Sequence, residues 1–257
     1  MCHIRKLSLC PDEQQVSEYT GAVSALRYAS AGGSRRIALL PDIYGVTPFY
    51  KGLASLLSDR RAVVYLVDPW QPFGELPEMT REAAWARRHH LRDRAFCDEL
   101  DAFLDQEGVD TIVGFCIGGN FVLELVRRGH RGTCCAFYPL PWGMANDDGL
   151  EAPFEYMEGL DHEVTILRGE QDPLAGPENI RRLREVCARN PAMDLHLYGV
   201  SGHGFLADVD SDQETLRSNA RAALDVVLNR VFRAPAPASI EHPAADGELL
   251  GSRGMTT

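Results

Sequence analysis

Seven short runs of apolar, β-prone residues recur along the chain, and they constrain the fold more than any other feature of the sequence. The runs cover residues 23–28, 37–41, 63–67, 111–115, 134–138, 164–168 and 194–198. Most of them are continuously apolar rather than alternating, which is typical of strands covered on both faces. Strands of this kind occur in parallel sheets that carry helices on both faces.

Amphipathic helical segments separate many of these runs. Apolar residues repeat at helical spacing in 93–107, 178–189 and 213–232. Strands alternating with helices over this length predict an α/β fold with a mostly parallel central sheet. We expect residues 1–233 to form a single domain. Residues 234–257 lose the periodicity and gain Pro, Gly and Ala, so we expect a disordered C-terminal tail.

Charge and hydropathy exclude several classes of function. The chain has 26 Lys and Arg against 37 Asp and Glu, a net charge of −11, whereas nucleic-acid binding requires a basic patch. No apolar run reaches the roughly 18 residues of a membrane span. The N-terminus also lacks the apolar stretch of a secretion signal. We therefore expect a cytoplasmic protein with neither nucleic-acid nor membrane partners.

The cysteines form no metal-binding pattern. There are seven of them, an odd number, and none forms a C-x-x-C pair. Reduced thiols in a reducing compartment are the simplest interpretation. We expect no metal and no cofactor, and a monomer or small homo-oligomer.

One cysteine stands in a motif that suits nucleophilic catalysis. The sequence G-F-C-I-G-G at 114–119 follows an apolar run and precedes a helical stretch. Strand, G-x-nucleophile-x-G and helix form the nucleophile elbow of α/β-hydrolases, here with Cys116 where serine is commoner. The glycines let strand and helix approach closely, and the helix N-terminus lowers the pKa of the thiol. The alternative is a glycine-rich turn with an inert buried cysteine.

A cysteine nucleophile needs a base, and the base needs an orienting acid. Asp172 follows the run 164–168, and His203, between two glycines, follows the run 194–198. This fold has the chain order nucleophile, acid, histidine. Each of the three residues also follows a different strand, at the edge where open parallel sheets bind ligands. Glu170 is the second candidate for the acid.

Two backbone N–H groups are predicted to form the oxyanion hole. In this fold one belongs to the residue after the nucleophile, Ile117, and the other to the loop after an early strand. Ile43 is the candidate in the loop after residues 37–41. Asp42 then lies near the sulfur, where a carboxylate disfavours the thiolate or accepts a hydrogen bond from the thiol. The alternative for Asp42 is an Asx turn.

Two further segments carry weaker indications. Residues 139–162 contain Trp142, Phe154, Tyr156 and Met157. A long aromatic segment beside a sheet edge forms a lid or pocket wall, and the alternative is a crossover packed on the surface.

His89 and His90 lie in a charged helical stretch with Arg87, Arg88 and Arg92. Charges clustered in this way are typical of a solvated helix face. We therefore expect neither histidine to be catalytic.

The chain resembles the dienelactone hydrolase family, cysteine-dependent members of the α/β-hydrolase fold, from about Arg36 to Phe232. The resemblance rests on P-D-I-Y-G-V at 41–46, G-F-C-I-G-G at 114–119, G-E-Q-D at 169–172 and G-H-G-F at 202–205. It implies that Cys116, His203 and Asp172 are nucleophile, base and orienting acid. It also implies that Ile43 and Ile117 donate the oxyanion hydrogen bonds.

Two positions depart from the family pattern. The family usually places Glu where this chain has Asp42, and that carboxylate is thought to control protonation of the cysteine. Members that act on dienelactone hold the substrate carboxylate with arginines, one of them at the position of Ala207 here. Arg81, Arg87 and Arg88 are other candidate anchors, although we expect them to be surface charges.

These features predict a hydrolase that cleaves a small ester or lactone through a Cys-His-Asp triad and a thioester acyl-enzyme. Ala207 and the aromatic segment 139–162 favour neutral over acidic substrates. The first alternative is a thioesterase or acyltransferase on the same scaffold. The second is a non-catalytic binding or redox-sensing protein that uses an oxidisable Cys116.

Overall fold

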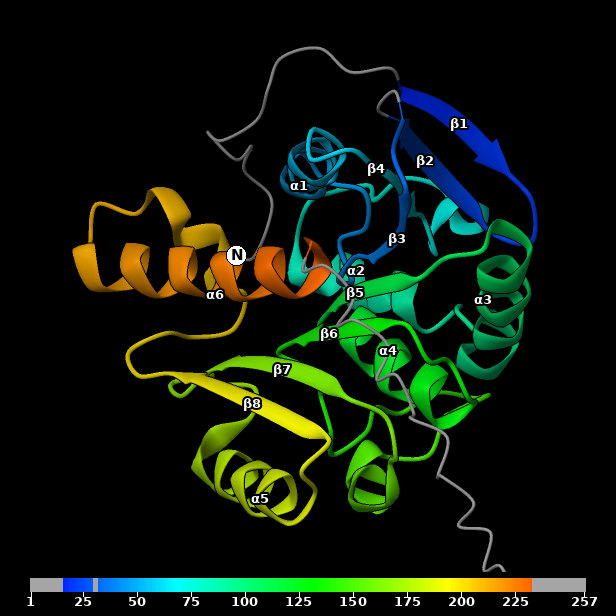
Figure 1. Ribbon diagram of the computed structural model, residues 1–257. Helices are drawn as coiled ribbons and strands as arrows, with labels where there is room; N and C mark the ends of the chain where they lie inside the picture. The colour runs from blue at the N-terminus through cyan, green and yellow to red at the C-terminus, as the bar shows by residue number, and fades with distance from the viewer. Residues whose placement is uncertain (1–15, 30–31, 233–257) are drawn as a thin grey trace, which may run out of the picture.

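An eight-stranded sheet runs through the computed structural model, which describes residues 16–29 and 32–232 (Figure 1). The strands are β1 (Val16–Thr20), β2 (Ser24–Ala29), β3 (Arg35–Leu40), β4 (Ala62–Val67), β5 (Thr111–Phe115), β6 (Thr133–Phe137), β7 (Val164–Gly169) and β8 (Met193–Tyr198). Their order in the sheet is β1-β2-β4-β3-β5-β6-β7-β8. The β1–β2 and β2–β4 pairs are antiparallel and the other neighbours are parallel. The predicted mostly parallel sheet is therefore confirmed.

The described residues form six α-helices, five of which pack on the sheet. They are α1 (Pro48–Ser58), α2 (Arg81–Arg88), α3 (Asp93–Glu107), α4 (Ile117–Arg127), α5 (Gly176–Arg189) and α6 (Glu214–Phe232). Short 3₁₀ helices span Gln71–Phe73, Pro153–Glu155, Met157–Gly159 and Phe205–Asp210. Helices α1 and α6 pack on one face, and α3, α4 and α5 pack on the other (Figure 1). Helices thus lie on both faces, as predicted.

Strand β6 shows how one strand supplies both apolar layers. Cys134 and Ala136 belong to the layer under α3, α4 and α5, whereas Cys135 and Phe137 belong to the layer under α1 and α6. Successive side chains of a strand point to opposite faces. A continuously apolar strand is therefore what a sheet covered on both sides requires.

The sequence predicted β2 to β8 and the helices α3, α4, α5 and α6 with boundary shifts of a few residues. It did not predict β1, because that edge strand is mostly exposed and carries no apolar run. It also did not predict α1, which is buried over most of its surface and so shows no single apolar stripe. The domain boundary at residue 233 and the tail 234–257 lie outside the described residues.

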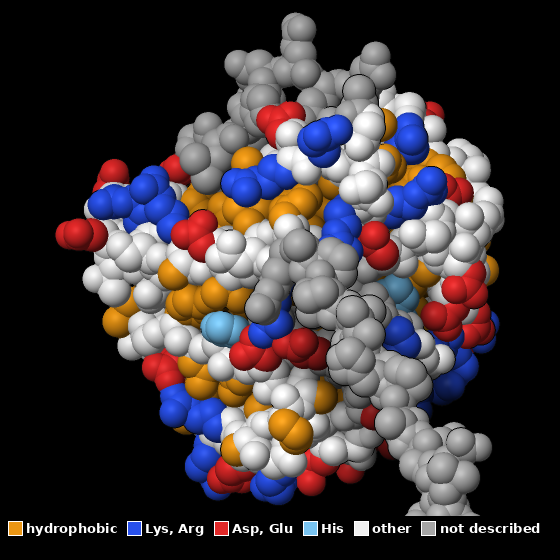
Figure 2. All heavy atoms as spheres, viewed as in Figure 1, with side chains coloured by type: hydrophobic (Ala, Val, Ile, Leu, Met, Phe, Trp, Pro, Cys, Tyr) orange, Lys and Arg blue, Asp and Glu red, His pale blue; other side chains and the backbone are white. Residues whose placement is uncertain are grey.

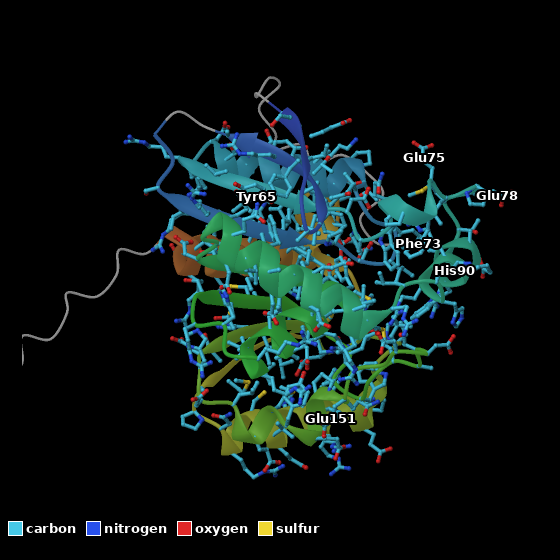
Figure 3. All side chains as sticks on the ribbon, turned by 90° about the vertical axis from the view of Figure 1, so that its right-hand side faces the viewer. Tyr65, Phe73, Glu75, Glu78, His90 and Glu151 are labelled. Carbon is cyan, nitrogen blue, oxygen red and sulfur yellow. The ribbon has the colours of Figure 1, made fainter. Side chains whose placement is uncertain are left out.

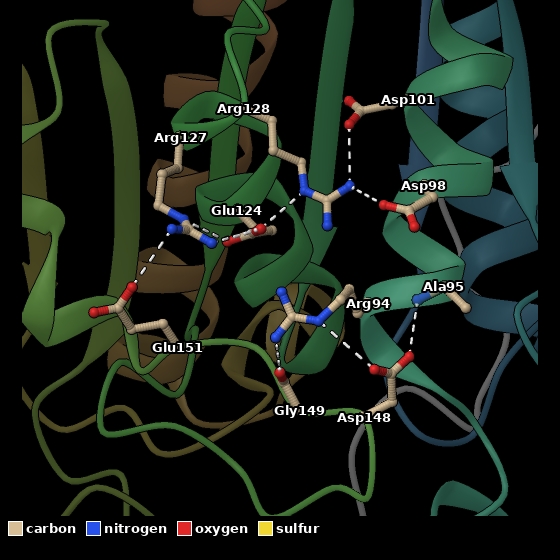
Figure 4. Close-up of polar contacts among 10 residues, drawn as sticks. All are labelled: Arg94, Ala95, Asp98, Asp101, Glu124, Arg127, Arg128, Asp148, Gly149 and Glu151. Carbon is tan, nitrogen blue, oxygen red and sulfur yellow. Dashed lines mark hydrogen bonds and ion pairs between the residues drawn. The ribbon is translucent and has the colours of Figure 1, made fainter.

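Helix α4, which begins directly after Cys116, is held in place by a buried carboxylate. Glu124 is only 1% exposed and accepts hydrogen bonds from Arg127 Nε at 2.8 Å and Arg128 Nε at 2.8 Å. Arg128 also reaches Asp98 and Asp101 of α3 (Figure 4). The network ties the helix of the elbow to its neighbour.

Charges of both signs are mixed on the surface. On the face drawn in Figure 2, the described acidic and basic side chains are interspersed rather than gathered by sign. Within residues 16–29 and 32–232, no helix is long and apolar enough to cross a membrane.

The Glu124 network predicts a stability effect. Replacing Arg127 and Arg128 together with Met leaves a buried carboxylate unpaired. We expect a loss of about 2–3 kcal/mol in the free energy of unfolding, below the value for fully buried pairs because both arginines are partly exposed. Urea unfolding measures it.

Adding Glu124→Gln to the double variant removes the buried charge and should recover part of the loss. Arg181→Met is the matched control, because its pair with Glu185 is exposed and worth less than about 1 kcal/mol. Equal losses in the double variant and the control would contradict the interpretation.

Candidate active site

Cys116 lies at the sharp turn between β5 and α4, as the elbow motif predicts. Its backbone has φ 55° and ψ −114°, a region that costs a non-glycine residue about 1–3 kcal/mol. Side chains at Gly114 and Gly118 would overlap neighbouring backbone, at the Gly118 and Leu40 carbonyls respectively. The Cys116 N–H donates to the Phe137 carbonyl at 3.0 Å. Close backbone packing therefore holds the strained turn.

Asp172 and His203 meet at the same edge of the sheet. Asp172 follows β7 and His203 follows β8, and Asp172 Oδ2 lies 2.8 Å from His203 Nδ1. Asp172 Oδ1 accepts the Leu174 N–H at 2.9 Å. The Tyr138 ring lies against the imidazole, with 4.7 Å between ring centroids. The contact fixes the orientation of the imidazole through Nδ1.

The charge of Asp172 is balanced inside the protein. Arg168 Nη2 lies 2.7 Å from Asp172 Oδ2, and both side chains are fully buried. Burial alone would raise the pKa of the Asp172 carboxyl. The hydrogen bond and charge of His203 together with the charge of Arg168 outweigh burial, so the pKa lies below its ordinary value.

Glu170, the second candidate for the acid, is engaged elsewhere. Its carboxylate forms an ion pair with Arg184 of α5, and its N–H donates to the Tyr198 carbonyl at 3.0 Å. The structure thus places Asp172, and not Glu170, against His203.

Cys116 and His203 open into a common pocket with a volume of about 350 Å³. The pocket is lined by Asp42, Ile43, Tyr44, Arg81, Trp85, Cys116, Pro173, Leu174, Gly202 and His203. The predicted nucleophile, base and loop residues Asp42 and Ile43 are therefore brought together. Ile117 lies directly behind Cys116 as the first residue of α4.

Hydrogen bonds to the Asp42 carbonyl fix the orientation of the Asp42–Ile43 peptide. The Asp42 carbonyl accepts hydrogen bonds from Trp70 Nε1 at 3.1 Å and from the Gly45 N–H at 3.0 Å. In a planar trans peptide the N–H points opposite to the carbonyl, so the Ile43 N–H points away from Trp70. Asp42 Oδ1 accepts the Tyr44 N–H at 2.9 Å, which is the Asx turn considered for this residue.

The three candidate arginine anchors differ in position. Arg87 donates to the Ile43 and Tyr44 carbonyls, and Arg88 is buried in an ion pair of 2.6 Å with Asp93. The expectation that these two are surface charges is wrong, because both support backbone or buried carboxylate. Arg81 is exposed but lines the pocket.

The histidines next to these arginines lie on the surface, as predicted. His89 and His90 are both exposed. The His90 ring lies beside Phe73, with 6.0 Å between ring centroids (Figure 3). Neither histidine lines the pocket of Cys116.

The aromatic segment 139–162 is a packed crossover rather than a lid. Phe154 and Met157 are buried in the apolar layer, and the Tyr156 ring lies under the Arg127 guanidinium. Trp142 covers Arg168. None of these four side chains lines the Cys116 pocket, so the expected lid or pocket wall is wrong and the packed crossover is the interpretation that holds.

Sequence reasoning missed Trp70, Arg168 and Tyr138. Arg168 carried a usable signal, a single charge near the end of an otherwise uncharged strand. Trp70 and Tyr138 carried none, because an aromatic residue after a strand is most often simply core.

The described residues offer no metal site. Among them, no group of three or more His, Cys, Asp or Glu side chains is arranged to hold a metal ion.

Comparisons with known proteins identify relatives over most of the chain. A sequence profile of the dienelactone hydrolase family matches residues 37–233. Carboxymethylenebutenolidase 2 of Cupriavidus pinatubonensis is 42% identical over 88% of this chain and 97% of its own length. Carboxymethylenebutenolidase of Rhodococcus opacus is 30% identical over 80% of this chain and 86% of its own.

Solved structures share the fold. A candidate dienelactone hydrolase from Klebsiella pneumoniae matches with a TM-score of 0.72 at 16% identity, over 87% of this chain and all of its own. Dienelactone hydrolase from Anabaena variabilis matches with a TM-score of 0.56 at 13% identity, over 84% of this chain and 98% of its own. At such low identity these two matches establish the architecture alone.

The pocket predicts which thiol reacts first. Iodoacetamide should label Cys116 before the other described cysteines, which are Cys97, Cys134, Cys135 and Cys187. Burial raises the pKa of Cys97 and Cys134 well above the ordinary value, and that of Cys135 and Cys187 to about 12. Thiols buried in this way react slowly.

Peptide mass spectrometry over a time course gives the order of labelling. Labelling of the unfolded chain, where all thiols should react alike, is the control. Simultaneous labelling of Cys116 and any of the four buried thiols in the folded protein would contradict the assignment.

Proposed function

The chain belongs to the dienelactone hydrolase family and is a hydrolase of carboxylic esters or lactones, and we propose that it acts through Cys116, His203 and Asp172. The contact between Asp172 and His203 carries the proposal. It fixes the imidazole beside a pocket that also contains the elbow cysteine. A nucleophile, a base and an orienting acid arranged in this way are the requirements of acyl transfer.

The proposed reaction proceeds in two halves. His203 takes the proton of the Cys116 thiol, and the sulfur attacks the substrate carbonyl carbon. The carbonyl oxygen becomes an oxyanion that accepts hydrogen bonds from the Ile43 and Ile117 N–H groups. As the tetrahedral intermediate collapses, the C–O bond of the ester breaks and the imidazolium protonates the leaving alkoxide. A thioester remains on Cys116.

Water completes the cycle. His203 takes a proton from the water, whose oxygen attacks the thioester carbonyl. Collapse of the second intermediate breaks the C–S bond, and the proton returns to the sulfur. The product is a carboxylic acid, or a hydroxy acid where the substrate is a lactone. Asp172 stabilises the imidazolium in both halves without taking the proton itself.

Backbone support favours Ile43 as an oxyanion donor. The Asp42 carbonyl, which shares a peptide bond with the Ile43 N–H, accepts a hydrogen bond from Trp70 Nε1. Arg87 donates to the Ile43 and Tyr44 carbonyls. Donors fixed in advance stabilise developing charge without reorganising. Asp42, buried at the same pocket, is proposed to disfavour a free thiolate until substrate arrives.

Arg81 favours acidic substrates. Among the described residues, it is the one cation lining the pocket. The relatives above are named for a butenolide ring that carries a carboxymethylene group. The expected preference for neutral substrates rested on Ala207 and on the aromatic segment 139–162. That segment does not line the pocket, so only Ala207 still supports the preference. We infer that small lactones bearing a carboxylate are bound with that group toward Arg81.

The triad makes unequal losses the expected result. Cys116→Ala and His203→Ala should each lower kcat for a chromogenic ester by at least about 10³-fold, and Asp172→Asn by less. Glu170→Gln is the matched control, since its carboxylate pairs with Arg184, and should stay within about twofold.

Near wild-type turnover in His203→Ala, or abolished turnover in Glu170→Gln, would refute the triad. Measuring products with and without an added alcohol separates hydrolysis from acyl transfer. An acyl adduct on Cys116 in mass spectrometry separates turnover from binding.

The role of Arg81 is tested with one acidic lactone and its methyl ester. Arg81→Gln should lower kcat/KM for the acid by about 3- to 10-fold, a modest factor because the side chain is exposed, and leave the ester within about twofold. The loss should shrink at high salt because an exposed charge is screened. Equal losses for acid and ester would overturn the inference.

A further inference from the structure

Arg168 lies completely buried behind the proposed catalytic carboxylate. Its Nη2 donates to Asp172 Oδ2 at 2.7 Å, and its Nη1 donates to the Pro139 carbonyl. The Trp142 ring covers the guanidinium, whose central carbon lies 5.3 Å from the ring centroid. Nε is buried without a hydrogen-bond partner among the described residues. The cation is therefore held rigidly and out of water.

Holding Asp172 in place does not by itself call for this cation. Leu174 already binds Oδ1 and His203 already binds Oδ2. Removing a guanidinium from water is costly, and a neutral side chain would fill the space without that cost. What a neutral residue could not supply is the positive charge.

That charge acts on the same oxygen that the imidazole uses. Asp172 Oδ2 contacts both Arg168 Nη2 and His203 Nδ1. An unpaired carboxylate stabilises the imidazolium and so favours the protonated base, whereas a nearby cation opposes it. By the same argument, a cation at this place also favours ionisation of the Cys116 thiol. Burial lowers the pKa of the Arg168 guanidinium and the Asp172 carboxylate opposes this shift. Arginine nevertheless keeps its proton under ordinary conditions, so the charge persists.

On the basis of the triad proposed above, we propose that Arg168 is a positioning residue that neutralises Asp172. His203 is then free of its proton, and Cys116 reactive, at a lower pH than beside an unpaired carboxylate.

Other groups also face the reacting pair and remain in every variant. They are Asp172 after β7, Tyr138 after β6, Asp42 after β3 and Arg81 of α2. None of these groups is altered in the variants, so a shift in the pH profile can be assigned to the substitution at position 168.

The test replaces Arg168 with Gln in the full chain. Gln keeps an N–H donor for Asp172 but no charge. Loss of the cation favours the protonated forms of both the imidazole and the thiol, so the direction is the same whichever group is observed. The acid limb of kcat/KM against pH should move up by about one pH unit. The pH dependence of Cys116 alkylation, which needs no substrate, should move by the same amount.

Two variants serve as controls. Arg168→Lys keeps the charge and should leave both profiles within about 0.3 pH unit of wild type, even where the lost hydrogen bond to Pro139 lowers the rate. Arg184→Met removes an exposed cation from the neighbouring helix and should leave both profiles unchanged, because water screens it.

Several results would overturn the proposal. Arg168→Gln could lower the rate equally at every pH and leave both the kcat/KM profile and the alkylation profile unshifted. That result would show that Arg168 only stabilises the structure. An upward shift in Arg168→Lys as large as in Arg168→Gln would show that geometry, not charge, is responsible. If the Gln variant does not fold, the Lys variant still tests the proposal, because the proposal requires both pH profiles of Arg168→Lys to match those of wild type. Hydrolysis retained in Cys116→Ala would refute the triad instead, while the alkylation profile would still report on Arg168.

Discussion

The close contact between the start of α4 and the end of β3 is the constraint on which the site depends. Gly118 lies against the Leu40 carbonyl, and Gly114 lies against Gly118, without room for a Cβ at either position. This packing forces Cys116 into its strained turn. It also brings the N-terminus of α4 next to the loop that contains Ile43. One backbone contact therefore places the nucleophile and both proposed oxyanion donors.

A second constraint is electrostatic. The Asp172 carboxylate is buried between His203 and Arg168, and it could not remain charged there without partners. Buried charges therefore hold His203, the proposed base, whereas close backbone packing holds Cys116, the proposed nucleophile. Chemistry of this kind tolerates little displacement, and both sides rest on strands of the same parallel sheet.

How far the sequence predicts this structure depends on whether a feature has a local pattern. The parallel strands and the elbow were predictable, because continuous apolar runs and G-x-C-x-G-G carry their own signal. The choice of Asp172 over Glu170 was supported by the following proline, which favours an extended or turn conformation at the strand end. The partners of a side chain across the fold carried no such signal. The sequence predicts a solvated helix face for Arg87 and Arg88. In the structure, Arg87 binds the Ile43 carbonyl and Arg88 binds the Asp93 carboxylate.

The division between fixed and variable parts follows from the same argument. Cys116, His203 and Asp172, the proposed catalytic residues, are held by backbone packing and buried charge. The opposite wall of the pocket comes from α2, through Arg81 and Trp85. Arg81 is exposed in the first turn of α2, so this position can change without disturbing the sheet, whereas Arg87 and Arg88 farther along the helix are held in place. In the proposed mechanism, the sheet edge therefore fixes the catalytic groups, and the exposed start of α2 is proposed to select the substrate.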